Sequence, residues 1–153
     1  MIVLRIGVYY ASMSGNTEAI ADIIAEELKE QQQEVALEEI VNMASASELL
    51  NYDLTIIGMY TWGDGEYPDE CLDITDELEE LELEGHPFAI FGSGDTSYPE
   101  FCGSLNQLKE LLEQQGGVVL HEPLRVEFNP EPEDEEDIRA FVSKVLSELK
   151  TRA

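Results

Sequence analysis

Basic residues are scarce in this chain. Its 153 residues include 8 Lys and Arg against 34 Asp and Glu, which gives a formal net charge of −26. Residues 30–108 contain neither Lys nor Arg. Nucleic acids and anionic membranes bind proteins through cations, so we expect neither as a partner. The charge favours encounters with a protein that carries a basic patch, although acidity that serves solubility alone would give the same composition.

Long apolar runs, an export signal and abundant cysteine are also lacking. No apolar run approaches the roughly 20 residues that a membrane helix needs. The apolar start of the chain is interrupted by Arg5 and has no basic leader or small-residue cleavage site, so it predicts a first strand. We therefore expect a cytoplasmic protein whose two cysteines, Cys71 and Cys102, are reduced thiols.

Short apolar runs alternate with amphipathic stretches along the chain. The runs are rich in β-branched and aromatic residues and predict strands at residues 2–9, 35–37, 54–59, 88–91 and 118–120. Apolar residues with helical spacing predict helices around residues 20–28, 105–112 and 138–149. An acid-rich stretch predicts a further helix over residues 68–83, and residues 45–50 fit a short helix or a turn.

This alternation predicts one α/β domain over residues 1–153. Strands that alternate with helices form right-handed βαβ units and a parallel sheet with helices on both faces. No linker, repeat or low-complexity segment divides the chain. In such doubly wound folds the ligand binds beyond the carboxyl ends of the strands, so the loops after the first, third and fourth strands are the candidate site.

The loop after the first strand, residues 11–17, is rich in hydroxyl groups. It reads Ala-Ser-Met-Ser-Gly-Asn-Thr and leads directly into a helix. Free N–H groups at a helix N-terminus attract anions, so this first loop suits a phosphate held by dipoles without Lys or Arg. It has neither the Gly-Lys-Ser/Thr of a P-loop nor a G-x-G-x-x-G fingerprint. Simple capping of the helix by Ser14 remains an open alternative.

The other two loops combine glycines with aromatic residues. The second loop, residues 60–68, contains Trp62, the single tryptophan of the chain, among glycines and acids. A large ring in such a loop suits stacking on a flat ligand or covering the end of the sheet. The third loop, residues 92–103, reads Gly-Ser-Gly-Asp-Thr-Ser-Tyr-Pro-Glu-Phe-Cys-Gly. Its glycines let backbone groups approach a ligand edge closely.

Together, S-x-S-G-N-T, T-W-G-D-G-E and G-S-G-D-T-S-Y-x-x-F-C-G resemble the three FMN loops of flavodoxins, in order and over the whole chain. Residues 118–127 have no room for the long insertion that marks long-chain flavodoxins, so the chain resembles the short-chain class. The resemblance implies a flavodoxin-like sheet in strand order 2-1-3-4-5. It implies that the phosphate is bound by Ser12, Met13, Ser14, Gly15, Asn16 and Thr17. Trp62 and Tyr98 would sandwich the flavin ring, and backbone near Asp95, Glu100 and Cys102 would meet its pyrimidine edge.

The resemblance also implies further contacts with FMN from Tyr60, Thr61, Gly63, Ser93, Gly94 and Phe101. The peptide between Gly63 and Asp64 would be the redox gate, because it is expected to turn its carbonyl toward flavin N5 when the ring gains its first electron. Glycine tolerates such a turn at little cost. We expect no metal and no catalytic residue.

The function implied is that of a low-potential one-electron carrier, monomeric and not an enzyme. It would shuttle electrons from a basic-faced partner, such as an NADPH-dependent flavodoxin reductase, to acceptors such as oxygenases or desaturases. Nearby acids would lower the potential: Asp64, Glu66, Asp69, Asp95 and Glu100. An FMN-dependent quinone or nitro reductase is the alternative. A signalling receiver is disfavoured because the acidic pair after the first strand is missing, and a Cys-dependent phosphatase because no Arg closely follows either Cys.

Overall fold

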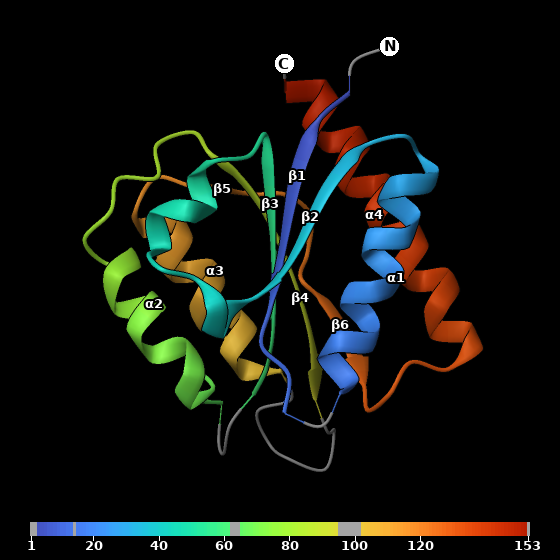
Figure 1. Ribbon diagram of the computed structural model, residues 1–153, viewed down its shortest axis with the longest axis horizontal. Coiled ribbons are helices and arrows are strands. Elements are labelled where there is room, and N and C mark those ends of the chain that lie inside the picture. Colours follow the sequence, from blue (N-terminus) through green and yellow to red (C-terminus); the bar gives the residue numbers. More distant parts are fainter. Residues whose placement is uncertain (1–2, 14, 62–64, 95–101, 153) are drawn as a thin grey trace.

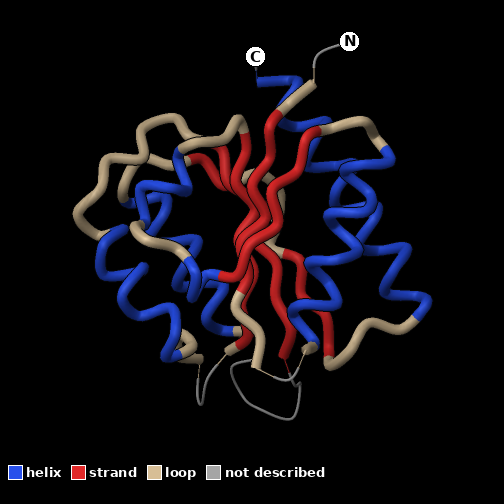
Figure 2. The backbone as a smooth tube through the Cα atoms, viewed as in Figure 1, coloured by secondary structure: helices blue, strands red, loops and turns tan. Residues whose placement is uncertain are grey.

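A parallel sheet crosses the centre of the molecule and has helices on both faces, as Figures 1 and 2 show. The computed structural model describes residues 3–13, 15–61, 65–94 and 102–152. The strand order β2-β1-β3-β4-β5 confirms the predicted topology, and a sixth strand also pairs with β4. The strands are β1 (Arg5–Tyr10), β2 (Glu34–Glu39), β3 (Leu54–Tyr60), β4 (Pro87–Gly94), β5 (Val118–Val119) and β6 (Leu124–Glu127).

Four α-helices lie in the described residues, two on each face of the sheet (Figure 1). Helices α1 (Asn16–Glu30) and α4 (Pro132–Arg152) cover one face, and α2 (Leu72–Leu78) and α3 (Gly103–Gln114) cover the other. Three short 3₁₀ helices complete the second face: η1 (Ile40–Asn42), η2 (Ala46–Leu50) and η3 (Asp69–Cys71). Residues 45–50 are thus a short helix, capped by the Ser45 hydroxyl, which accepts a hydrogen bond from the N–H of Ser47.

Two elements differ from the sequence prediction. The fifth strand is split, because β5 and β6 both pair with β4 but are separated by residues 120–123, where His121 has a left-handed φ of 62°. The helix predicted over residues 68–83 is shorter and consists of η3 followed by α2. Tertiary contacts end it early, because Leu83 donates its N–H to the carbonyl of Gln115.

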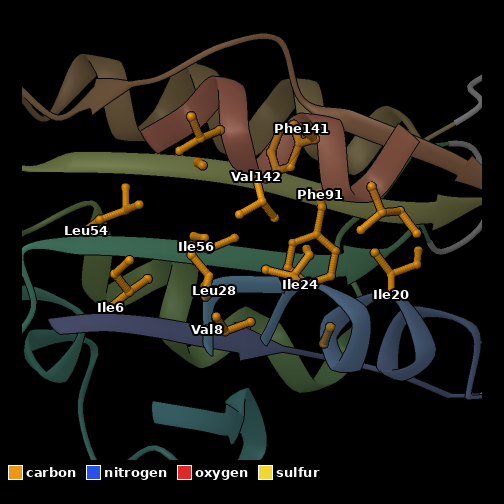
Figure 3. Close-up of a cluster of buried hydrophobic side chains, with 14 of the residues drawn as sticks. Ile6, Val8, Ile20, Ile24, Leu28, Leu54, Ile56, Phe91, Phe141 and Val142 are labelled. Atoms are coloured by element: carbon orange, nitrogen blue, oxygen red, sulfur yellow. The ribbon is translucent and has the colours of Figure 1, made fainter. Parts of the chain in front are cut away.

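The core consists of two apolar layers, one on each face of the sheet. Successive side chains along a strand point to opposite faces, so Phe91 belongs to the layer under α1 and α4 while Ile90 belongs to the other. Figure 3 shows the first layer, in which Ile20, Ile24 and Leu28 of α1 meet the strands. Burial on both faces explains why the strands appear in the sequence as nearly continuous apolar runs.

Helices α1 and α4 are also joined by charge. The Arg139 guanidinium lies 2.9 Å from Glu26 and Glu27, and 3.1 and 3.2 Å from Glu30 and Glu135. Hydrogen bonds from Gln31 and then from Arg139 lower the pKa of the Glu27 carboxyl. Among the described residues, no helix is long and apolar enough to cross a membrane.

Candidate functional site

The first loop ends in a helix N-terminus whose N-cap is a glycine. Gly15 is the N-cap of α1, with a left-handed φ of 91°, and no side chain of the described residues caps the first turn there. The Ser12 hydroxyl instead accepts a hydrogen bond of 3.1 Å from the N–H of Gly15. The first N–H groups of a helix lack intrahelical partners, so this end is free to bind an anion. Ser14 lies outside the described residues, and Gly15 occupies the cap position.

Buried hydroxyls attach this helix end to the sheet. The hydroxyls of Thr17, in the first turn of α1, and Ser93, near the end of β4, are 2.7 Å apart and almost fully buried. At the end of β1, the Tyr10 hydroxyl donates a 3.1 Å hydrogen bond to Glu18. The first loop is therefore held against the ends of β1 and β4, where the predicted phosphate position and the third loop meet.

The basic residues of β1 and α1 lie far from this point. Arg5 begins β1 and Lys29 is in the last turn of α1, so both belong to the opposite end of their elements. The first loop consequently offers backbone N–H groups and hydroxyls but no cation of its own strand or helix. Such a set of donors suits a phosphate group bound through dipoles and hydrogen bonds.

Helix α3 holds both sides of the second loop. The Ser104 hydroxyl is 2.9 Å from that of Thr61 and donates a 3.2 Å hydrogen bond to the Tyr60 carbonyl, while the Ser104 N–H donates to the Thr61 hydroxyl over 3.2 Å. One helical turn later, the Gln107 side-chain amide donates to the carbonyl of Gly65. Between these contacts are Trp62, Gly63 and Asp64, which lie outside the described residues.

The start of the second loop is partly buried and lies close to a carboxylate. Burial, followed by the nearby Glu70 carboxylate, raises the pKa of Tyr60 to about 12, so its hydroxyl stays protonated at neutral pH. Oxygen Oε1 of Glu70 is buried and has no hydrogen-bond partner in the described part of the protein. This end of the sheet therefore carries negative charge close to the loop that the sequence assigns to the flavin ring.

The third loop is described only at its two ends. Ser93 and Gly94 end β4, and Cys102 is the N-cap of α3 with a left-handed φ of 54°. Burial raises the pKa of the Cys102 thiol to about 11, with Arg125 acting in the opposite direction, so the thiol is neutral at pH 7. The predicted contacts at Asp95, Tyr98, Glu100 and Phe101 lie outside the described residues.

Three residues beside the site were missed by the sequence analysis: Ser104, Gln107 and Arg125. Arg125 faces the base of the third loop, because β6 pairs with β4 so that Arg125 lies opposite Gly92, and its guanidinium donates to the Asn106 side chain. Ser104 and Gln107 touch residues more than 40 positions away in the chain. No local pattern marks such contacts, because they depend on strand order and register.

The comparison with known protein families identifies the family to which this chain belongs. Residues 8–141 match the model of the flavodoxin family. The chain belongs to that family. Probable flavodoxin 1 of Bacillus subtilis is 46% identical over 139 residues, covering 90% of this chain and 87% of the relative. Probable flavodoxin 2 of the same organism is 43% identical over 137 residues, covering 90% and 91%. The crystal structure of oxidised flavodoxin 2 from Bacillus cereus superposes with a TM-score of 0.90 at 44% identity, covering 94% and 99%.

This flavodoxin is an electron-transfer protein with FMN as its cofactor, and it is not an enzyme. Membership of the family thus removes the alternative of a quinone or nitro reductase. Within the described residues, no group of three or more His, Cys, Asp or Glu side chains is placed to hold a metal ion.

The described residues of the flavodoxin fit FMN. Its phosphate needs several donors at one point, and the N-terminus of α1 with the hydroxyls of Ser12 and Thr17 would supply them. A Cβ added at Gly15 would meet no atom within 4 Å, so there is open space beside Gly15 at this helix end. When it is bound, FMN supplies the redox chemistry through a ring that accepts electrons one at a time.

Proposed function

We propose that this protein is a low-potential carrier of single electrons, a cytoplasmic monomer that shuttles between an NADPH-dependent reductase and acceptor enzymes such as oxygenases or desaturases. The observation that carries the proposal is the distribution of charge. The chain has a net charge of −26, and its first loop combines an open helix N-terminus with the absence of a nearby cation on its own strand and helix. An acidic surface of this kind speeds weak encounters with basic partners.

The FMN site that we propose combines all three loops. The first loop would bind the phosphate, with Ser12, Gly15 and Thr17 already placed around the N-terminus of α1. From the second and third loops, the flavin ring would be contacted by Tyr60, Thr61, Trp62, Gly63, Ser93, Gly94, Asp95, Tyr98, Glu100, Phe101 and Cys102. Burial of Cys102 supports a role as a neutral neighbour of the ring, because its thiol carries no charge at neutral pH.

Acids near the ring oppose the addition of an electron that is not accompanied by a proton. Each carboxylate at about 10 Å opposes it by about 0.4 kcal/mol in a water-like dielectric. For one electron, about 1.4 kcal/mol corresponds to about 59 mV, so several acids together lower the potential by on the order of 100 mV. Glu66 and Asp69 are exposed beside the second loop, and the Arg125 cation acts in the opposite direction.

A redox titration followed by absorbance tests the proposal. Three neutral substitutions, Asp64→Asn, Glu66→Gln and Asp69→Asn, should together raise the potential of the second one-electron step by about 50 mV. They should also slow electron transfer from a basic reductase at low salt. Glu34→Gln is the matched control, because Glu34 is exposed at the amino end of β2, away from the loops.

Two results would contradict the proposal. Purified protein that stays colourless and binds no added FMN at micromolar concentration would remove the carrier function altogether. Unchanged potentials and rates in the triple variant would leave the cofactor in place and remove the role of the acids.

A further inference from the structure

Four of the six large exposed hydrophobic side chains in the described residues follow the carboxyl ends of strands. The six are Val3, Met13, Leu37, Val41, Leu72 and Phe128. Met13 follows β1, Val41 follows β2, Leu72 begins the helix after the second loop, and Phe128 follows β6 directly. These four thus come after the carboxyl ends of strands, the edge of the sheet from which the three loops begin. Val3 precedes β1 at the opposite end.

Phe128 differs from the other three in its backbone. Its φ of 57° is left-handed, a conformation that bulky residues rarely adopt because Cβ crowds the backbone. The N–H of Phe128 donates a 3.0 Å hydrogen bond to the carbonyl of Gly94, which fixes this conformation beside the end of β4. Gly or Asn would make the same turn with less strain.

The side chain of Phe128 contributes little to the hydrophobic core. It is 53% exposed, although it lies next to the third loop of the FMN site. The hydrogen bond to Gly94 fixes the backbone but does not require an aromatic side chain at this position, and strained residues cluster at functional positions. Exposed aromatic residues at a binding face commonly act as anchors that carry much of the interaction energy.

The chemistry around Phe128 indicates what kind of partner the ring meets. Glu131 and Glu133 are exposed in the segment that follows, and the whole chain carries a net charge of −26. The nearest cation in sequence, Arg125, is engaged with the Asn106 side chain. A second copy of this acidic chain would be repelled, whereas a protein with a basic face and an apolar centre is complementary in both respects.

We propose that Phe128 is the apolar anchor on which a basic-faced redox protein docks during electron transfer. The proposal rests on the carrier function proposed above and names one residue of its docking surface. Charge brings the two proteins together from a distance, and the ring of Phe128 then holds the encounter beside the third loop by excluding water.

The test uses the FMN-loaded, fully reduced protein and ferric cytochrome c as a basic acceptor. In each encounter one electron leaves the flavin and reduces ferric haem to ferrous haem. Phe128→Asn removes the ring while keeping a residue that tolerates the left-handed turn, and Phe128→Tyr keeps the ring. Val3→Asn is the matched control at the opposite end of the sheet, where the exposed fraction is 58%.

We expect the second-order rate constant of Phe128→Asn to fall about fivefold, which corresponds to the loss of a modest anchor. The factor should be the same at low and high ionic strength, because the lost contact is apolar, whereas loss of a surface charge changes the dependence on salt. Phe128→Tyr and Val3→Asn should stay within twofold of the wild-type rate.

Each other outcome overturns the proposal in a recognisable way. A wild-type rate in Phe128→Asn removes the anchor while FMN binding shows that the carrier function survives. A shift of the flavin potentials in Phe128→Asn means that the ring acts on the cofactor rather than on the partner. A dimer in sedimentation experiments that Phe128→Asn dissociates assigns the ring to self-association. Failure of the wild-type protein to bind FMN removes both proposals.

Discussion

At the scale of single residues, His86 shows how burial changes a titration. Its imidazole Nε2 lies 2.9 Å from the hydroxyl of Thr55, and its ring centre is 4.8 Å from that of Phe88. The Thr55 hydroxyl donates to the carbonyl of Leu49, so it accepts the hydrogen bond from Nε2–H of neutral His86. Burial lowers the pKa of His86, and the Asp53 carboxylate opposes the shift.

His86 should therefore make the fold less stable in mild acid. The unfolded chain binds a proton at His86 more readily than the folded chain, so this residue's contribution to stability is complete above the unfolded pKa near 6.5 and falls as the pH drops below it. Urea unfolding of wild type and His86→Gln from pH 8 to pH 5 measures the effect as a difference between the two proteins. We expect the wild type to lose stability relative to His86→Gln below about pH 6.5. A difference that stays constant across this range would contradict the explanation.

Single residues of the site differ in how well the sequence revealed them. Gly15 and Thr17 were predicted from a local pattern of hydroxyls before a helix, and they lie at the N-terminus of α1 as that pattern requires. Arg125 was missed, because nothing in its own segment indicates that it lies opposite Gly92. Local chemistry can be recognised from neighbours in the chain, whereas a contact across the sheet cannot.

At the scale of elements, helix α3 serves as the support of the second loop. Ser104 and Gln107 lie three residues apart on one face of the helix, and they contact the residues immediately before and after residues 62–64. Ser104 is fully buried, so its hydrogen bonds are not exchanged with water. The helix thereby fixes where the second loop leaves β3 and where it returns.

Loss of these contacts should weaken FMN binding. Ser104→Ala leaves partly buried polar groups at Tyr60 and Thr61 with fewer partners, which costs about 1 kcal/mol. We expect the FMN dissociation constant to rise roughly fivefold in Ser104→Ala, since about 1.4 kcal/mol is a factor of ten, and by a smaller factor in Gln107→Leu. Fluorescence titration of the apoprotein with FMN measures both.

Gln114→Leu is the control for this experiment. Gln114 belongs to the same helix, but its exposed side-chain amide donates a hydrogen bond to the carboxylate of Glu110 rather than to Tyr60, Thr61 or Gly65. Equal FMN affinity in Ser104→Ala and wild type would show that the second loop needs no support from α3.

The elements themselves were predicted well where their pattern is local. The strands and the helices α1, α3 and α4 follow from apolar spacing, and Pro132 begins α4 as its fixed φ favours. Helix α2 was predicted too long, because the acid-rich stretch over residues 68–83 carries no local signal for a helix end at Leu78. The Gln115 side chain donates to the carbonyls of Glu79 and Leu81. In a longer helix these carbonyls would accept hydrogen bonds from the helix backbone instead.

At the scale of the whole molecule, the net charge lowers the stability of the fold and speeds association with basic partners. With 34 Asp and Glu against 8 Lys and Arg, folding brings like charges together. The contacts of Arg139 with four carboxylates offset only part of this repulsion. Salt screens exposed charges beyond about 10 Å at 0.1 M, so it relieves repulsion within the fold and also weakens attraction to a basic partner.

Salt should therefore stabilise the protein and slow its reactions. Between low salt and 0.5 M NaCl we expect the free energy of unfolding to rise by on the order of 1 kcal/mol, the sum of a few pairs of about 0.4 kcal/mol each. Over the same range the rate of electron transfer with a basic partner should fall. Thermal or urea unfolding and stopped-flow kinetics measure the two effects.

KCl at the same ionic strength provides the control, because screening does not depend on which monovalent cation is used. A different stabilisation by the two salts would indicate specific ion binding instead. Stability that falls with added salt would contradict the role given to charge repulsion.

The sequence by itself determined the alternation of strands and helices, the two-faced core, the acidic surface and the three loops that belong to flavodoxins. All of these depend on residue type and spacing within short segments. Only the tertiary structure decided the split of the fifth strand, the support of the second loop by α3 and the position of Arg125. It also decided the left-handed backbone and the exposed ring of Phe128. These features arise from contacts between residues far apart in the chain, which exist only once strand order and register have been set.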